Sequence, residues 1–239
     1  MTVVEHLEEL RGRLIKVLVC VGALSVAGYF YYEPILAFLA APAKPHVTEL
    51  YFFGPAAAFL VQLKVAVFSG LIFSSPFILY HVWMFVSPGL YEGEQKVVLP
   101  SVVISSFLFF AGTCFGYVVA LPVGLGFLLG YQTPLLKPLL DVDEYLSFTM
   151  MYLAGFGIVF DLPVFVVGLV KLHVLKSSTL RKFRRGFILG AFIVAAVLTP
   201  PDVASQLLMA IPILILYEVS ILAAVLVEKW EHRKKGSEV

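Results

Sequence analysis

The chain has 239 residues, of which 60% are apolar and only 14% are charged, and its mean hydropathy is +0.96. A soluble domain has about 45–50% apolar and roughly 25% charged residues, so this composition excludes a water-soluble globular protein and predicts an integral membrane protein. The formal net charge of +1 provides no overall field that would attract nucleic acid.

Long apolar stretches predict an all-α, polytopic membrane protein in which residues 1–239 form a single domain with six transmembrane helices. A spanning helix needs about 20 apolar residues to cross roughly 30 Å of hydrocarbon. The first four stretches and the sixth reach that length, whereas the fifth has only about 13 residues and a length of roughly 20 Å. The expected spans are 14–32, 65–86, 97–121, 148–170, 187–199 and 204–227.

The short fifth span is followed at once by "TPPD", residues 199–202. Proline removes a backbone donor and restricts the residue before it, so this sequence ends the helix. The fifth and sixth spans are therefore expected to form a tight hairpin, and the short fifth helix is expected to thin the bilayer locally.

The distribution of Lys and Arg predicts the orientation in the membrane, because cytoplasmic flanks carry an excess of both. Fourteen of the 17 basic residues lie on one set of flanks, which places both termini and the loops 88–96 and 172–186 in the cytoplasm. The other three, Lys44, Lys64 and Lys137, lie on the opposite set of flanks.

The outward stretch 33–64 is rich in proline and is expected to form a cap of short helices and turns.

Enzyme signatures are absent from the sequence. It contains no H-E-x-x-H, no G-x-S-x-G and no Walker A motif. Its five His and two Cys residues are scattered, without the spacing of metal ligands or of a disulfide framework. We therefore expect neither an enzyme nor a bound metal or cofactor.

Acidic residues lie at the inner edge of the first spans, where basic residues would be more usual. Glu9 is four residues from both Glu5 and Arg13. On a helix this spacing predicts like-charge repulsion with Glu5 and a surface ion pair with Arg13. The stretch "FVSPGLYEGE", 85–94, ends in a short loop with Glu92 and Glu94. Two carboxylate groups on one membrane face could bind two guanidinium groups. The alternative is that the acids of both stretches are ordinary solvated surface groups.

Three further acids fall inside or beside the predicted spans: Asp161, Glu218 and Asp202. A charged Asp near the bilayer centre costs about 2.5–3.5 kcal/mol on insertion scales, which makes it a candidate functional group. The alternative for Asp161 is a packing role, with its carboxyl group hydrogen-bonded to a neighbour such as Gln206 or Thr149.

Five motifs in register resemble the TatC family, the multispanning receptor subunit of the twin-arginine protein translocase. They occur in order over nearly the whole chain, and that family has six spans and inward termini. The motifs are "HLEELRGRL" (6–14), "FVSPGLYEGE" (85–94), "FGIVFDLP" (156–163), "LTPPDVASQ" (198–206) and "IPILILYE" (211–218).

This resemblance implies docking of the signal peptides of folded proteins destined for export from a bacterial or archaeal cytoplasmic membrane. The residues that would read the paired arginines are Glu9 and Glu94, with Arg11 and Phe85 in support. Twin-arginine signals are addresses that a receptor reads rather than anchors.

The resemblance also implies partners and an energy source: single-span TatA- and TatB-like subunits, self-association and the protonmotive force. The partners are expected to dock near the fifth span and the polar face around Asp161 and Gln206. The family usually has Glu where this chain has Asp161, so the charge is retained on a shorter stem. The expected intramembrane polar and docking residues are Asp161, Gln206, Asp202 and Glu218.

The residues leave two other functions open. The first is a proton-coupled secondary transporter that uses Asp161 or Glu218; such transporters are built from repeats, and none is visible in this sequence. The second is an intramembrane hydrolase, for which the sequence supplies no recognisable nucleophile and base.

Overall fold

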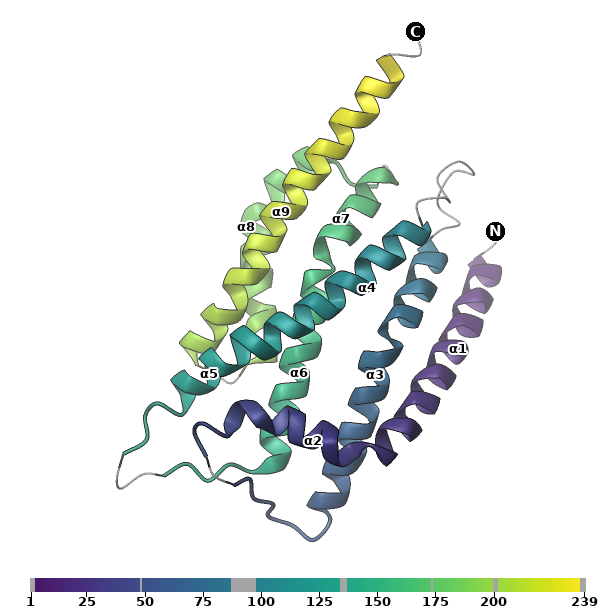
Figure 1. The fold of residues 1–239 in the computed structure, drawn as a ribbon. Coiled ribbons are helices and arrows are strands. Elements are labelled where there is room, and N and C mark those ends of the chain that lie inside the picture. The colour runs from purple at the N-terminus through teal and green to yellow at the C-terminus, as the bar shows by residue number, and fades with distance from the viewer. Residues whose placement is uncertain are drawn as a thin grey trace.

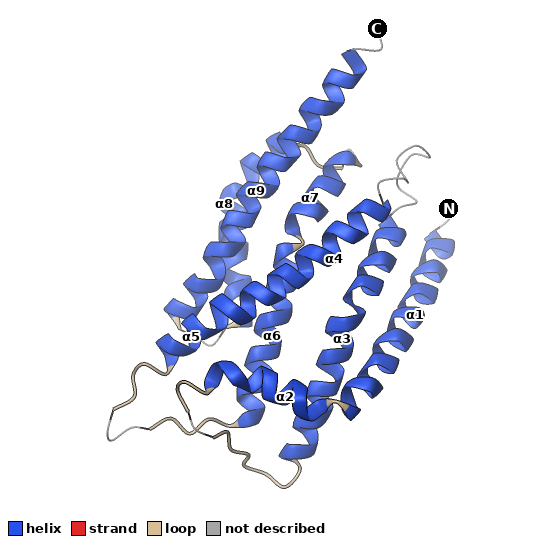
Figure 2. Cartoon of the chain, in the orientation of Figure 1, coloured by secondary structure: helices blue, strands red, loops and turns tan. Residues whose placement is uncertain are grey.

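The computed structural model describes residues 3–47, 49–86, 98–133, 137–172, 174–199 and 202–236. Within these ranges the chain is helical apart from turns, coil and one isolated β-bridge between Tyr51 and Asp141 (Figure 2). The helices are α1 (Val3–Phe30), α2 (Tyr32–Ala40), the 3₁₀ turn η1 (Ala41–Ala43), α3 (Ala57–Val86), α4 (Val98–Phe115), the π-helical turn η4 (Gly116–Ala120), α5 (Leu121–Leu128), α6 (Val142–Phe160), α7 (Leu162–Lys171), α8 (Ser177–Leu198) and α9 (Val203–Gly236).

Five of the described helical segments are long and apolar enough to cross a membrane, which confirms a multi-pass, all-helical architecture. The helix α8 is not among them, because the first half of its 22 residues is strongly basic. The five segments are Val4–Phe30, Ala57–Phe85, Val98–Leu128, Val142–Lys171 and Val203–Trp230.

Two predicted boundaries were wrong. The expected loop 172–186 is helical from Ser177 onwards, so the fifth apolar stretch is the second half of a longer helix. A helix does not have to end where the sequence becomes charged. The expected span 148–170 is also interrupted, because α6 ends and α7 begins on either side of Asp161. Pro163, at the start of α7, is the local cause, since proline fits the first turn of a helix but not its interior.

The helices α1 and α3 pack side by side along most of their length (Figure 1). Small residues allow this close approach. A Cβ atom added to Gly70 would lie 2.7 Å from the backbone nitrogen of Ser25 and 2.8 Å from the carbonyl oxygen of Val21. On the other side of the contact, a Cβ atom on Gly28 would overlap the Ser69 side chain. The α1–α3 contact therefore depends on glycine at both positions.

A second close contact joins α4 to α6. A Cβ atom on Gly112 would lie 2.5 Å from the Phe156 carbonyl oxygen, and one on Gly157 would lie 2.7 Å from the Phe109 ring. Gly112 of α4 and Gly157 of α6 thus allow these two helices to pack closely. By contrast, Gly190 of α8 has no atom within 4 Å of the position its Cβ would take, so it makes no such contact.

The end of the bundle opposite the start of α1 and the end of α9 carries a cap built around α2 (Figure 1). Two tyrosine hydroxyls tie α2 to the bundle: Tyr117 donates to the Phe38 carbonyl at 2.7 Å and Tyr145 to the Leu39 carbonyl at 2.8 Å. The ion pair of Lys64 with Asp143, at 2.6 Å, joins α3 to α6 at the same end. Short helix, turns and coil in this region agree with the cap expected from its prolines.

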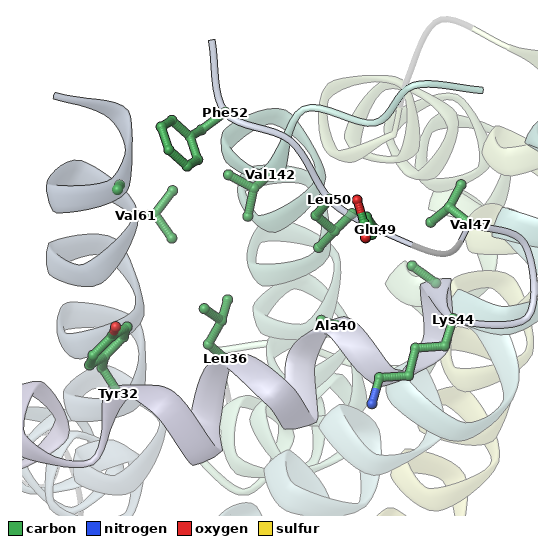
Figure 3. A pocket seen from close by; sticks show the side chains of 12 residues that line it. Tyr32, Leu36, Ala40, Lys44, Val47, Glu49, Leu50, Phe52, Val61 and Val142 are labelled. Carbon is green, nitrogen blue, oxygen red and sulfur yellow. The ribbon is translucent and has the colours of Figure 1, made fainter. Parts of the chain in front are cut away.

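A hollow of about 360 Å³ lies in this cap, between α2, the loop after it, α3 and α6. Figure 3 shows the side chains of Leu36, Leu50, Val61 and Val142 facing it from these four segments. The two charged residues of its lining are Lys44 and Glu49. The hollow is an apolar feature of the cap rather than a cluster of reactive groups.

Candidate functional site

The first candidate site lies at the end of the α1–α3 pair that is remote from the cap. The His6 ring of α1 stacks on the Phe85 ring of α3, with centroids 4.2 Å apart and planes inclined by 18°. Two residues before Phe85, Trp83 fixes α3 to its neighbours: its Nε1 donates to Ser105 Oγ of α4 at 3.2 Å and its indole stacks on Phe165 of α7. The structure therefore places Phe85 against the N-terminal motif.

Glu9 follows His6 by one helical turn and has one engaged and one unengaged carboxylate oxygen. Its Oε1 accepts from Arg13, with the Arg13 Nε at 2.8 Å and a second bond from Nη2. Its Oε2 is buried and has no hydrogen-bond partner among the described residues. The expected ion pair with Arg13 is present, but it satisfies only half of the carboxylate.

A buried acceptor without a donor is costly, about 1–3 kcal/mol, so a donor arriving at Oε2 would gain more there than at a solvated carboxylate. A guanidinium group presents such donors in a planar fork. Arg11 is exposed on the same helix. Glu94, the second expected acid, lies outside the described residues, so its relation to Glu9 stays a prediction.

Asp161 lies at the turn between α6 and α7 and is almost completely buried, with 1% of its surface exposed. Its backbone carbonyl accepts from the amides of Val164 and Phe165 at 3.1 Å and so starts α7. Its Oδ1 has no hydrogen-bond partner in the described part of the chain. The turn thus holds a buried carboxyl group that these backbone bonds do not satisfy.

The two partners suggested for Asp161 are engaged elsewhere or too far away. Gln206 Nε2 donates to the Phe192 carbonyl of α8 at 3.0 Å. Thr149 belongs to the helix that leads into the turn but precedes Asp161 by 12 residues, or about 18 Å along the helix. Neither of the two suggested hydrogen bonds to Asp161 is therefore present among the described residues, while the packing role itself stays an alternative.

Asp202 caps the first turn of α9. Its Oδ1 accepts from the backbone amide of Ser205 at 2.7 Å, which satisfies one of the free amides at the helix start. Its Oδ2 is buried without a partner within the described ranges, as are the hydroxyls of Ser205 and of Tyr152. This acid has a structural role that accounts for its position beside the proline turn.

Replacing Asp202 by alanine is expected to lower the free energy of unfolding by about 1 kcal/mol, the usual cost of a lost cap. Asp202→Asn should leave stability nearly unchanged, because asparagine caps as well as aspartate. Thermal unfolding in one detergent would compare the two variants. Equal losses for both would show that the negative charge, and not the cap, matters at this position.

Glu218 is paired rather than isolated in the apolar span. Its Oε2 lies 2.6 Å from Arg184 Nη2 of α8, and both side chains are about half exposed. The expected docking residues Asp161, Asp202, Gln206 and Glu218 therefore do not form one cluster, since Glu218 follows Gln206 by 12 residues, or about 18 Å, along α9. Only Asp202 and Gln206 lie within one helical turn of each other.

His81 was missed by reasoning from the sequence. It is buried on α3, one turn before Phe85, with edge-on contacts to the Phe77 and Tyr80 rings, and its Nδ1 has no partner among the described residues. The indication in the sequence was a histidine, His81, within the otherwise apolar stretch "FILYHVWMF".

The fold defines a class: a multi-pass, all-helical membrane protein, with a partly unpaired carboxylate beside an aromatic stack at one end of a helix pair. The comparisons name the family. A sequence profile described as "Sec-independent protein translocase protein (TatC)" matches residues 5–212. The chain belongs to the TatC family, whose members are components of a protein translocase and not enzymes.

Similar proteins cover almost the whole chain. "Sec-independent protein translocase protein TatC" of Desulforapulum autotrophicum is 40% identical over 92% of this chain and 83% of its own length. The protein of the same name from Carboxydothermus hydrogenoformans is 40% identical over 94% and 93%. A solved structure, "Crystal Structure of Twin Arginine Translocase Receptor- TatC", matches with a TM-score of 0.85 and 38% identity, over 93% of this chain and 99% of that one.

Proposed function

We propose that this chain is the receptor subunit of a twin-arginine translocase and that it binds signal peptides of folded proteins through Glu9 and Glu94. The observation that carries the proposal is the buried Oε2 of Glu9, which lacks a partner among the described residues and lies one turn from the His6–Phe85 stack. An arginine of the signal would donate to this oxygen, while Arg11 and Phe85 support the bound segment. The solved structure that this chain matches is that of a twin-arginine translocase receptor, which supports this role.

The proposal includes a topology: one domain, 1–239, with α8 as a sixth and short span, a tight α8–α9 hairpin, and both termini in the cytoplasm. The basic residues at one set of flanks support it, and in Figure 1 the start of α1 and the end of α9 lie at the same end of the bundle. The acids of the receptor site then face the cytoplasm, where signal peptides arrive.

Assembly is the second part of the proposal. Single-span TatA- and TatB-like subunits and further copies of this chain would dock on α8 and α9, near Gln206, Asp202 and Glu218, and export would draw on the protonmotive force. Asp161 would serve docking or proton relay. The membrane would be the cytoplasmic membrane of a bacterium or archaeon.

The alternative, a proton-coupled transporter, is less well supported. Glu218 already pairs with Arg184, which leaves Asp161 as the acid for such a site. Uptake of a small solute by proteoliposomes that contain only this chain would support the alternative.

The receptor proposal predicts that the purified chain binds an Arg-Arg signal peptide more tightly than its Lys-Lys counterpart. Lysine cannot reproduce the planar fork of arginine. Glu9→Ala and Glu94→Ala should each weaken Arg-Arg binding by about 1.5–3 kcal/mol, roughly tenfold or more, the usual worth of a hydrogen bond to a charged group. Fluorescence anisotropy of labelled peptides, with the chain in nanodiscs, measures the affinities.

Glu8→Ala is the matched control, because it removes an exposed carboxylate from the neighbouring position of α1. Its affinity for the Arg-Arg peptide should equal that of the unmodified chain. If Arg-Arg and Lys-Lys peptides bind equally, or if Glu8→Ala and Glu9→Ala behave alike, these acids form only a solvated helix face and the receptor site is elsewhere.

A further inference from the structure

The helix α8 presents one continuous exposed face, on the side away from α9. Lys182, Arg185, Leu189 and Ile193 share this face by helical spacing, and all four are exposed. The buried residues of the same helix, such as Ala191 and Ala195, lie on the opposite side. The face is therefore cationic in its first turns and apolar in the turns that follow.

The cations on this face have no counter-charge among the described residues. Arg184 points toward α9 and pairs with Glu218. Within the described residues no ion pair involves Lys182 or Arg185, or Arg181 at the edge of the same face. The helix itself has no acidic residue, and the carboxylate of Glu228 accepts from Ser177 at its start. Two to three cations are thus left for an external anion.

The order of groups along α8 matches the layout of a phospholipid. Just beyond Arg185 the helix continues as an apolar stretch, 187–198, of about 18 Å, with Leu189, Ile193 and Val197 exposed. A phosphate beside Lys182 and Arg185 would place the acyl chains along these side chains. Basic groups at the cytoplasmic ends of membrane helices attract anionic headgroups, at about 1 kcal/mol per cation.

We propose that the exposed face of α8 binds an anionic phospholipid of the inner leaflet, with the headgroup on Lys182 and Arg185 and an acyl chain along Leu189 and Ile193. An apolar helix on the same face would cover the lower part but leave both cations without a partner. A zwitterionic lipid brings its own cation and cancels most of the attraction. Net negative charge in the headgroup is therefore what the face selects.

The test compares lipid binding to the full-length chain by native mass spectrometry from detergent, with phosphatidylglycerol and phosphatidylcholine of identical acyl chains. We expect the unmodified chain to retain the anionic lipid about tenfold better, the effect of roughly 1.4 kcal/mol. The double variant Lys182→Gln with Arg185→Gln should lose most of this preference. Lys44→Gln with Lys137→Gln, which removes the same charge from exposed positions outside α8, should retain it.

Three outcomes would overturn the proposal: equal retention of the two lipids, equal loss in both double variants, or an unchanged preference after removal of Lys182 and Arg185. If the α8 variant keeps its lipid preference but no longer self-associates, the face is an interface between copies of this chain. Circular dichroism melting of each variant would check that the fold is intact, which we expect because these exposed side chains make no ion pair with any described residue.

Discussion

Replacing Gly70 with leucine is expected to abolish signal-peptide binding, although Gly70 lies 15 residues, or about 22 Å, from Phe85 along α3. A Cβ atom at this position would lie within 3 Å of the Ser25 amide nitrogen and the Val21 carbonyl oxygen, and backbone atoms of a helix cannot move aside. The helix α1 must therefore shift away from α3. This separation breaks the His6–Phe85 stack and removes the burial of Glu9 Oε2 on which the proposed site depends.

The matched control is Gly22→Leu, because a Cβ atom on Gly22 of α1 has no neighbour within 4 Å. Anisotropy titration of the Arg-Arg peptide should give no measurable affinity for the Gly70 variant and a normal affinity for the Gly22 variant. Normal binding by the Gly70 variant would mean that the site does not need the α1–α3 contact.

Much of the architecture is readable from the sequence because membrane helices are set by apolar length. Five of the expected spans overlap helical segments that are long and apolar enough to cross a membrane, although the fourth is interrupted at Asp161. The basic half of α8 was not predictable from the same rule, because the hydropathy of residues 177–186 does not distinguish a loop from a helix that leaves the membrane. Pro163 was a local indication of the break at Asp161, but the apolar stretch around it has the normal length of a span and so predicted an uninterrupted helix.

Site residues were harder to predict than spans, since their chemistry depends on contacts between distant residues. The pairing of Glu9 with Arg13 follows from their i, i+4 spacing, whereas the burial of the other Glu9 oxygen arises in the folded structure. The pairing of Glu218 with Arg184 joins two helices and could not be inferred from spacing. Asp202 had a readable role: an aspartate between a proline turn and an apolar helix is typical of a helix cap.

The variant Asp161→Asn is expected to stop export while leaving signal-peptide affinity and thermal stability almost unchanged. Asparagine has nearly the same volume, so the turn between α6 and α7 keeps its packing, and the backbone bonds to the Asp161 carbonyl do not involve the side chain. The change removes a buried carboxyl group whose Oδ1 has no partner in the described chain. A buried neutral amide is less costly than a buried carboxylate, so stability should not fall.

Among the described residues no hydrogen bond to Asp161 Oδ1 explains why this buried carboxyl group is retained, and this is why a functional role is expected. Export of a folded reporter into inverted vesicles, with the peptide titration and a melting curve on the same preparations, separates the possibilities. Asp161→Glu should keep export, because the carboxyl group is preserved on a stem one methylene longer. If Asp161→Asn instead melts earlier and loses peptide affinity together with export, the residue is part of the packing at this turn, and the docking or relay role fails.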